Sequence, residues 1–575
     1  MSKRAGSCRS VGEPYGMKRG DRMPRYTIGV DFGSLSGRAV LVNASDGREI
    51  ASAQLNYPHG VMDRSLPSGI PLPPDWALQH PQDYLDVLDA TLPELARHVD
   101  PADIVGIGLD CTSSTVLPVD AQGTPLCLTD RFRDTPHAWV MMWKHHAAQE
   151  QARRMTRIAE ERREPWLPLY GGKVNAEWYF PKLLQVLEEA PEVYAAMAHY
   201  VEMTDWLVWR LTGRQTRSAG CLGYKAFHAG QFPDNAFFRA LNPAFGNVVE
   251  EKVSGPILPL GECAGTLTEE AARRYGLRPG IAVATGNIDA HVCVPAAGID
   301  GPGKLLAIIG TSTCHILMGK RTLPVPGMSG VVRDGVLPGW AGYEAGQSCV
   351  GDSFHWFERT CVPAAYEQEA ASRGLSVQAL LTEKAARLRP GESGLLALDW
   401  WNGNRSVLAD ADLTGLLLGM TLQTTPEEIY RALLESTAYG ARVILENYRD
   451  SGVPVEAFHA SGGIPQKNAL AMQIYADVLQ MPVRISSAAQ GPALGSAIFA
   501  AVAAGFYPTA AEAARAMGGK DETVCYPQPE NAAIYDRLYQ EFKALHDLFG
   551  RGGSDVMKRL KALRNMSGKA ENDHE

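Results

Sequence analysis

Asp31 is the first residue in the chain with an obvious chemical use. It ends the apolar, β-rich run Tyr26 to Asp31 and is followed by Gly33 and by the hydroxyls of Ser34 and Ser36. A carboxylate beside a glycine turn with free backbone N–H groups suits a phosphate and its Mg²⁺, the metal being held through water. Taken alone, the pattern equally fits a plain β-hairpin in which Asp and Ser satisfy the turn.

A second aspartate, Asp289, follows the apolar run Ile281 to Ala284 and precedes an alanine-rich helical start. An aspartate at such a place either caps the helix or acts as a base that takes the proton of an acceptor hydroxyl. Phosphoryl transfer needs little more than positioning, charge neutralisation by Mg²⁺ and such a carboxylate. Two separated aspartates, one near the metal and one near the substrate, meet that need.

Two further glycine-rich turns follow strand-like runs. Gly310 and Thr311 open a turn after Lys304 to Ile309, and Gly462-Gly463 follows Ala457 to Ala460. Neither a G-x-x-x-x-G-K-[ST] loop nor a G-x-G-x-x-G turn that opens a helix after a strand is present, which argues against P-loop and dinucleotide-binding folds.

These motifs require strands that alternate with helices. The strand, glycine turn and strand at the start of the chain are repeated about 280 residues later, and each pair is followed by another buried strand. We expect helices over 81–98, 138–158 and 426–448, the last begun by Thr425, Pro426 and Glu428 in a T-x-x-E capping box. The order predicts an α/β protein built from a duplicated unit.

Composition excludes several classes of function. The net charge is −9, but residues 1–25 hold seven basic and two acidic residues, so the rest of the chain carries −14. An acidic body argues against nucleic-acid binding. The basic start lacks an apolar secretory segment, and the most apolar late stretch, 491–506, is shorter than the ~20 residues that cross a bilayer. Ten cysteines without a C-x-x-C pair favour a reducing cytoplasm.

In this order, the two hairpins and the Gly-Gly turn resemble the ATPase domain that sugar kinases share with actin and the 70-kDa heat-shock chaperones. From Tyr26 to Tyr539 the chain resembles the FGGY family of carbohydrate kinases. The segments that carry this resemblance are DWLVWRLTG at 205–213, GLLLGM at 415–420, IYRALLE at 429–435 and QGPALGSA at 490–497. The resemblance implies two duplicated actin-like (ribonuclease H-like) ATPase domains around a central cleft, with ATP and Mg²⁺ as cofactors.

Four shorter strings resemble the members of the family that phosphorylate L-ribulose: WKHH at 143–146, GYKAFH at 223–228, GTSTC at 310–314 and EAGQS at 344–348. They imply transfer of the γ-phosphoryl group of ATP to the 5-hydroxyl of L-ribulose, in the catabolism of L-arabinose. The alternatives are an FGGY kinase for D-ribulose, L-xylulose or ribitol, and a non-catalytic actin-like ATPase.

The resemblance also implies roles for single residues. Asp289 would be the catalytic base. The ketopentose would contact Ser113, Lys225, Asp289 and Glu344. The nucleotide would lie against Asp31, Ser34, Ser36, Gly310, Thr311, Gly462, Gly463 and Asn468, with Asp31 also serving Mg²⁺.

Some of these side chains have an ordinary alternative. A lysine and a glutamate far apart in sequence, such as Lys225 and Glu344, are often plain surface charges. Trp143 either stacks on the sugar or packs in a helix beside Met141 and Met142. Leu35 stands where glycerol kinases carry a hydroxyl in the first hairpin, which removes a hydroxyl contact but not the hairpin.

The expected organisation is a disordered basic tail at 1–25, an N-terminal domain at 26–285, a C-terminal domain at 286–548 and a flexible tail at 549–575. The N-terminal domain would bind the sugar and carry the first hairpin, and the C-terminal domain would carry the second hairpin and the adenosine site. Partners would be ATP and a ketopentose, with no nucleic acid or membrane, and a homodimer is compatible with the sequence.

Overall fold

The computed structural model describes residues 24–488, 490–519 and 522–572. Most of the basic segment predicted to be a disordered tail, residues 1–23, lies outside the described residues. Arg25, the last residue of that segment, is tied to the first domain, since its guanidinium lies 3.2 Å from the Asp103 carboxylate and donates to the Ala102 carbonyl.

The first domain is built on a sheet whose central strand is β1 (Tyr26–Phe32). The order across the sheet is β11 (Cys263–Thr266), β12 (Ala282–Ala284), β5 (Ile104–Cys111), β1, β2 (Ser36–Asn43) and β3 (Glu49–Asn56), and β13 (Asn287–Ile288) also pairs with β5. Strands β1, β5 and β12 run parallel, whereas β2, β3 and β11 run antiparallel to their neighbours. Because helices cover both faces, β1 and β5 are almost wholly buried, which explains their continuous apolar runs.

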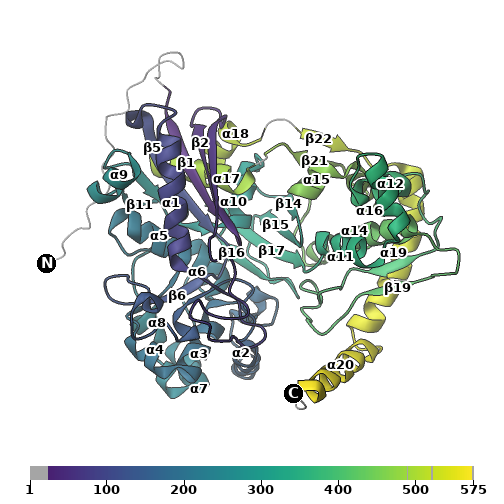
Figure 1. Ribbon diagram of the computed structural model, residues 1–575, viewed down its shortest axis with the longest axis horizontal. Helices are drawn as coiled ribbons and strands as arrows, with labels where there is room; N and C mark the ends of the chain where they lie inside the picture. Colours follow the sequence, from purple (N-terminus) through teal and green to yellow (C-terminus); the bar gives the residue numbers. More distant parts are fainter. Residues whose placement is uncertain (1–23, 489, 520–521, 573–575) are drawn as a thin grey trace.

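The second domain repeats this sheet. Its order is β16 (Gly330–Arg333), β17 (Ala341–Gln347), β15 (Thr313–Gly319), β14 (Lys304–Ile309), β20 (Ala457–Ser461), β21 (Val483–Ser486) and β22 (Glu522–Cys525). β14 is antiparallel to β15 and parallel to β20, as β1 is to β2 and β5. The prediction of a duplicated, actin-like α/β fold is confirmed. Figure 1 shows the two halves side by side.

Helix α17 (Gly491–Ala503) belongs to the second half of the chain but packs on the first sheet (Figure 1). Glycines allow the approach: a Cβ on Gly29 would lie 1.8 Å from the Ala493 carbonyl oxygen, and one on Gly108 would lie 2.0 Å from that of Ser496. A glycine lets another backbone approach closely because it has no Cβ. At these two positions the close neighbour is a helix.

The N-terminal domain also carries smaller elements below its sheet (Figure 1). A four-stranded sheet has the order β4 (Leu78–Gln79), β7 (Val140–Met141), β6 (Val116–Val119) and β8 (His199–Glu202). Strands β9 (Arg217–Ser218) and β10 (Ile257–Leu258) form a pair. The helices of this half are α1 (Pro81–Ala96), α2 (Gln149–Arg162), α3 (Tyr179–Glu189), α4 (Pro191–Ala196), α5 (Met203–Thr212), α6 (Ala219–Lys225), α7 (Asn235–Leu241), α8 (Val248–Lys252), α9 (Glu269–Tyr275) and α10 (Asp289–Ala296).

The helix expected over 138–158 is wrong in its first half. Residues 140–141 form β7, and the helix α2 begins only at Gln149. The backbone of the intervening loop bonds to another segment, because Met142 N–H donates to the Ala77 carbonyl and His146 N–H to the Asp75 carbonyl. Long-range hydrogen bonds therefore replace the local ones that a helix would make.

In the second half, helix α14 (Pro426–Asp450) begins as predicted: the Glu428 carboxylate accepts from the Thr425 backbone N–H at 2.7 Å. The other elements are α11 (Gly351–Cys361), α12 (Ala364–Ser372), α13 (Val377–Ala385), the pair β18 (Leu396–Leu398) and β19 (Leu416–Leu418), α15 (Gly463–Lys467), α16 (Ala469–Leu479), α18 (Ala510–Met517) and α19 (Pro529–Gly550).

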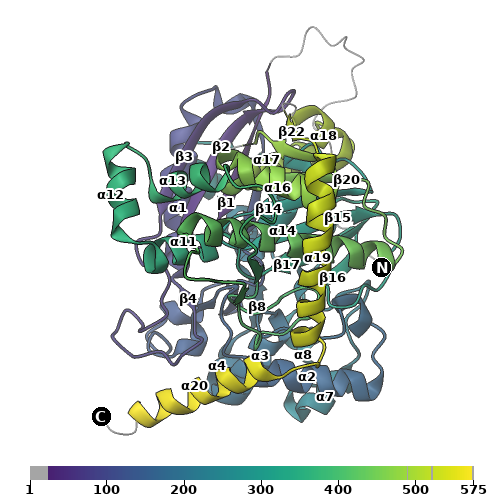
Figure 2. The ribbon, with the colours of Figure 1, turned by 90° about the vertical axis from the view of Figure 1, so that its right-hand side faces the viewer.

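The C-terminal segment that we expected to be a flexible tail contains helix α20 (Val556–Asn572), which extends beyond the end of α19 (Figure 2). Lys558 and Lys561 ion-pair with Asp410 and Asp412 at 2.7 and 3.1 Å. Over the described ranges, no helix has the length and apolarity to cross a membrane.

Candidate active site

Three aspartates converge at one edge of the first sheet. Asp31 is the last residue but one of β1 and lies opposite Asp110 in the register of the parallel strand β5. Asn287 of β13 also pairs with Asp110 and leads to Asp289. Parallel strands end at the same edge, so these side chains meet there. The Asp31 and Asp110 side chains are close enough to share a hydrogen bond.

This crowding of buried carboxylates alters their pKa values. Burial is the main cause and raises the pKa of Asp31, of Asp110 and of Asp289, the last to about 7. Mutual repulsion adds to the effect, since Asp31 also raises the pKa of the other two. A carboxylate that titrates near neutral pH is suited to accept a proton, and the local excess of negative charge and oxygen ligands suits Mg²⁺.

Asp110 was not among the predicted site residues. Its Oδ2 accepts from the hydroxyl of Ser496 of α17 at 2.6 Å. The signal that would have found Asp110 is present in the sequence, because an aspartate follows the apolar run Ile104 to Leu109 just as Asp31 follows the apolar residues 26–30.

The alternative role of Asp289 as a helix cap does not fit the structure. The N-cap of α10 is Ile288, and Asp289 is the first residue of the helix. Its Oδ1 accepts from the adjacent Ala290 N–H at 2.7 Å. Lys225 and Glu344 are near enough to influence its pKa, so the predicted base and two predicted sugar residues occupy one site.

The first hairpin joins β1 to β2. Its turn is closed by a hydrogen bond from Gly33 N–H to the Ser36 carbonyl at 3.0 Å. Ser34 lies under Trp143, whose indole N–H donates to the Ser34 hydroxyl at 2.9 Å. Trp143 is therefore neither helical nor simply core, and it supports the hairpin. Leu35 at the tip is 62% exposed.

The second hairpin joins β14 to β15, where Gly310 N–H donates to the Ser312 carbonyl at 2.9 Å. The Thr311 carbonyl accepts from Val350 N–H at 2.8 Å. Gly462 lies against this hairpin: its φ is +101°, and a Cβ there would lie 2.5 Å from the carbonyl oxygen of Ile309. Only glycine suits that position.

The next two residues of the predicted adenosine site lie just beyond. Gly463 begins α15, and apart from its chain neighbours and the backbone of its own helix no described atom lies within 4 Å of the place where its Cβ would be, so its surface is open. Asn468 has its side chain engaged already: Oδ1 accepts from Ala471 N–H at 2.9 Å as the cap of α16, and Nδ2 donates to the Tyr430 hydroxyl at 3.2 Å.

Lys225 and Glu344 are paired with each other and are not plain surface charges. Lys225 ends α6 in the first domain and Glu344 lies in β17 of the second. The Lys225 ammonium lies 2.9 and 3.2 Å from the two Glu344 oxygens, and His291 Nε2 lies 3.0 Å from Oε2. Although burial opposes it, the charge of Lys225 and the bond to His291 hold the pKa of Glu344 below its usual range. The pair presents a donor and an acceptor between the domains.

His291 was missed, although it stands two residues after the predicted base. Ser113 lies half-buried in the turn between β5 and β6, two residues beyond the end of the strand that carries Asp110. That turn starts from the same sheet edge as the aspartates.

A second ion pair joins the domains beside the first. The Arg405 guanidinium lies 3.5 Å from Glu177 Oε1, which His146 Nε2 also approaches to 2.9 Å. Burial opposes the shift, but Arg405 and His146 lower the pKa of Glu177 to about 2. The first and last residues of the WKHH string therefore have structural roles: Trp143 supports the first hairpin, and His146 contacts the glutamate of this ion pair.

The fold defines a two-domain α/β protein of the actin-like ATPase class. The FGGY carbohydrate kinase N-terminal domain matches residues 26–294 and the C-terminal domain residues 305–504. The chain therefore belongs to the FGGY family of carbohydrate kinases. A carbohydrate kinase takes ATP as one substrate and a sugar as the other.

Curated relatives match nearly the whole chain. A protein named ribulokinase from Bacillus licheniformis is 55% identical over 541 residues, which is 92% of this chain and 98% of the relative. One of the same name from Halalkalibacterium halodurans is 53% identical over 552 residues, covering 94% and 98%. Among solved structures, xylulose kinase from Rhodospirillum rubrum has a TM-score of 0.73 and 25% identity over 91% of this chain and 98% of its own.

Proposed function

We propose that the protein transfers the γ-phosphoryl group of ATP to the 5-hydroxyl of L-ribulose, with Mg²⁺, as a step in L-arabinose breakdown. The observation that carries the proposal is the identity of more than half of all positions, over almost the full length of both chains, to relatives named ribulokinase. The buried Lys225–Glu344 pair between the domains supports it, because a ketopentose needs both donors and acceptors.

In this proposal each part of the site has one task. Asp289 takes the proton from the attacking hydroxyl, and Asp31 holds Mg²⁺ through water. Lys225 and Glu344 hold the sugar, with Ser113 contributing from the turn after β5. The backbone and hydroxyls of the two hairpins bind the phosphates (Ser34, Ser36, Gly310 and Thr311), and the adenosine lies on Gly462, Gly463 and Asn468. When bound, Mg²⁺ neutralises charge on the phosphates.

The test of the substrate is an ADP-release assay with each of the four 2-ketopentoses and the four pentitols. L-Ribulose should give the highest kcat/KM, because buried polar groups left unpaired by a sugar without the matching hydroxyl are costly. A higher kcat/KM for D-xylulose or ribitol would contradict the substrate and leave a kinase of the same family. No sugar-dependent ADP release would contradict the reaction itself.

The test of the base is Asp289→Asn. It should keep nucleotide and sugar binding but lower turnover by about 10² to 10⁴, the usual contribution of a general base. Binding is measured by calorimetry and turnover by ADP release. Asp130→Asn, at an aspartate whose side chain is 94% exposed, is the matched control and should behave as wild type. Turnover of Asp289→Asn above roughly a tenth of wild type would contradict the assignment.

A further inference from the structure

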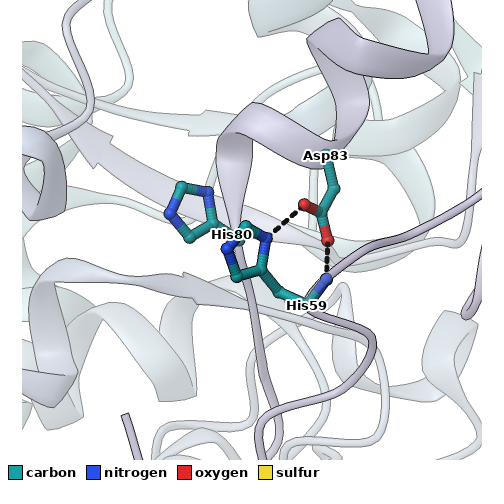
Figure 3. Close-up of side chains that lie close together, drawn as sticks. All are labelled: His59, His80 and Asp83. Atoms are coloured by element: carbon teal, nitrogen blue, oxygen red, sulfur yellow. Dashed lines mark hydrogen bonds and ion pairs between the residues drawn. The ribbon is translucent and has the colours of Figure 1, made fainter. Parts of the chain in front are cut away.

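Two histidines and a buried aspartate lie together outside the candidate active site (Figure 3). His59 follows strand β3, His80 caps helix α1, and Asp83 lies in the first turn of that helix. One ligand-capable atom from each residue lies within 4.8 Å of the other two. None of the three takes part in the phosphoryl-transfer site proposed above.

The three side chains are already close to one another. His59 Nδ1 lies 2.6 Å from Asp83 Oδ1, and the His59 backbone N–H donates to Oδ2 at 3.2 Å. The His59 and His80 rings stack with centroids 4.1 Å apart and planes inclined by 16°. Figure 3 shows the two imidazoles side by side next to the carboxylate.

The charges in this cluster favour a cation. The Asp83 side chain is fully buried, whereas that of His59 is 39% exposed. His80 Nδ1 accepts a hydrogen bond from the Gln82 backbone N–H at 3.1 Å, so this nitrogen carries an electron pair that can also bind a metal ion. Asp86, one turn along α1, adds negative charge near the same ring. A buried carboxylate beside an imidazole nitrogen with an available electron pair favours a bound cation.

We propose that His59, His80 and Asp83 form a binding site for a divalent transition metal ion of the kind that imidazole prefers, with Zn²⁺ as the probe. Two imidazoles and one carboxylate are a known set of protein ligands for zinc. Bond lengths of about 2.0 to 2.2 Å place the ligands of a tetrahedral ion about 3.3 Å apart. The His59–Asp83 pair must therefore open slightly and His80 must approach, and the exposed His59 ring has room to turn.

One existing bond competes with the metal. His80 Nδ1 accepts from the Gln82 backbone N–H at 3.1 Å as the cap of α1. Ligation through Nδ1 replaces this bond, and the loss of a helix cap typically lowers affinity about fivefold, and at most about thirtyfold. We therefore expect binding in the micromolar range.

Residues next to this site in the sequence make hydrogen bonds to the first hairpin. Gln79, which precedes His80, donates from its side chain to the Ser34 carbonyl at 2.9 Å. Tyr57, two residues before His59, donates from its backbone N–H to the Leu35 carbonyl at 2.9 Å. A bound ion joins the two segments that support this hairpin, so it should slow hydrogen exchange of the hairpin amides.

The experiment is a calorimetric titration of ZnCl₂ into chelator-treated full-length protein that carries no histidine tag, without nucleotide. His59→Ala and His80→Asn should each weaken binding at least about tenfold. Asn keeps an acceptor that caps helices but lacks the imidazole, so His80→Asn separates ligation from helix capping. The matched control is His98→Ala just beyond the other end of α1, which should bind as wild type.

The aspartates of the active site can also bind a cation, and the variants distinguish that case. Zn²⁺ binding that survives unchanged in His59→Ala and His80→Asn overturns the proposal, as does the absence of micromolar binding in wild type. Hydrogen exchange is the second readout. Slower exchange around Ser34 on adding Zn²⁺, in wild type and His98→Ala but not in His80→Asn, supports the site, and the same slowing in all variants overturns it.

Discussion

At the scale of single residues, Asp289 should set the pH dependence of the reaction. Its pKa is raised to about 7, chiefly by burial and then by Asp31. A base works only when deprotonated, so kcat/KM should be constant at high pH and fall as the pH drops through the pKa of this group. A bound Mg²⁺ favours the charged form, which places the inflection between about pH 5 and 7.

The measurement is kcat/KM for the sugar across that range, with stability checked at each pH. In Asp289→Asn the residual rate should lose this inflection. A wild-type rate that rises as the pH is lowered would contradict the base assignment.

Glu344 should determine sugar binding without affecting ATP. Glu344→Gln keeps the shape of the side chain but removes its charge and one of the two acceptor oxygens that Lys225 and His291 contact. Losing hydrogen bonds to a charged group costs about 1.5 to 3 kcal/mol, so kcat/KM for L-ribulose should fall about 10- to 100-fold. ATP affinity measured without sugar should stay as in wild type.

The control for this change is Glu392→Gln, at a partly exposed glutamate paired with Arg389 on the surface. An equal loss of ATP and sugar affinity in Glu344→Gln, or a large fall in its Tm, would indicate a structural role for the pair.

At the scale of elements, the contact of α17 with β1 and β5 holds the two halves of the chain in one fold. Gly108→Ala should weaken this contact, because the new Cβ would lie 2.0 Å from the Ser496 carbonyl oxygen and the helix would have to move. Overpacking of this kind costs about 1 to 3 kcal/mol, which predicts a Tm lower by about 2 °C or more.

Thermal unfolding followed by circular dichroism measures this effect. Gly301→Ala is the matched control, since no atom lies within 4 Å of its Cβ position. If Gly108→Ala had the same Tm as wild type and Gly301→Ala, α17 would be able to shift without cost, and its close approach to the sheet would not limit stability.

At the scale of the whole molecule, two neighbouring ion pairs, Lys225–Glu344 and Arg405–Glu177, join the domains around the sugar residues. Arg405→Ala removes the Arg405–Glu177 pair, here called the outer pair, and leaves the Lys225–Glu344 pair in place. Since the side chains of the outer pair are 23% and 17% exposed, its loss should cost about 1 kcal/mol. We expect KM for L-ribulose to rise about fivefold, with a smaller change in kcat.

If the outer pair holds the two domains together around the sugar, its loss should lower the population of the closed conformation. This change should increase the radius of gyration. Small-angle scattering with sugar and a non-hydrolysable ATP analogue should give a larger radius of gyration for Arg405→Ala than for wild type. Arg389→Ala, at a surface arginine whose side chain is 85% exposed, is the control. A variant with wild-type KM and wild-type radius would show that the outer pair does not hold the domains together.

Local patterns were enough to predict much of this architecture. The apolar runs that end at Asp31 and Gly310 predicted both hairpins, because burial on two faces leaves a continuous apolar strand. The start of α14 was also predictable, because the capping box at Thr425 uses hydrogen bonds between residues only three positions apart. The helix expected over 138–158 was wrong in its first half because bonds from Met142 and His146 to distant carbonyls replaced local ones.

The sequence by itself determined the fold class, both hairpins and the family, since these depend on short-range patterns and contiguous strings. Only the tertiary structure decided which charges face each other. Lys225 and Glu344 are 119 positions apart and nothing local relates them, while the pairing of β1 with β5 is what places Asp110 opposite Asp31. The physical reason is that a buried charge is stable only beside its partner. These partners come together only when the two domains pack against each other, with α17 of the second half lying on the sheet of the first.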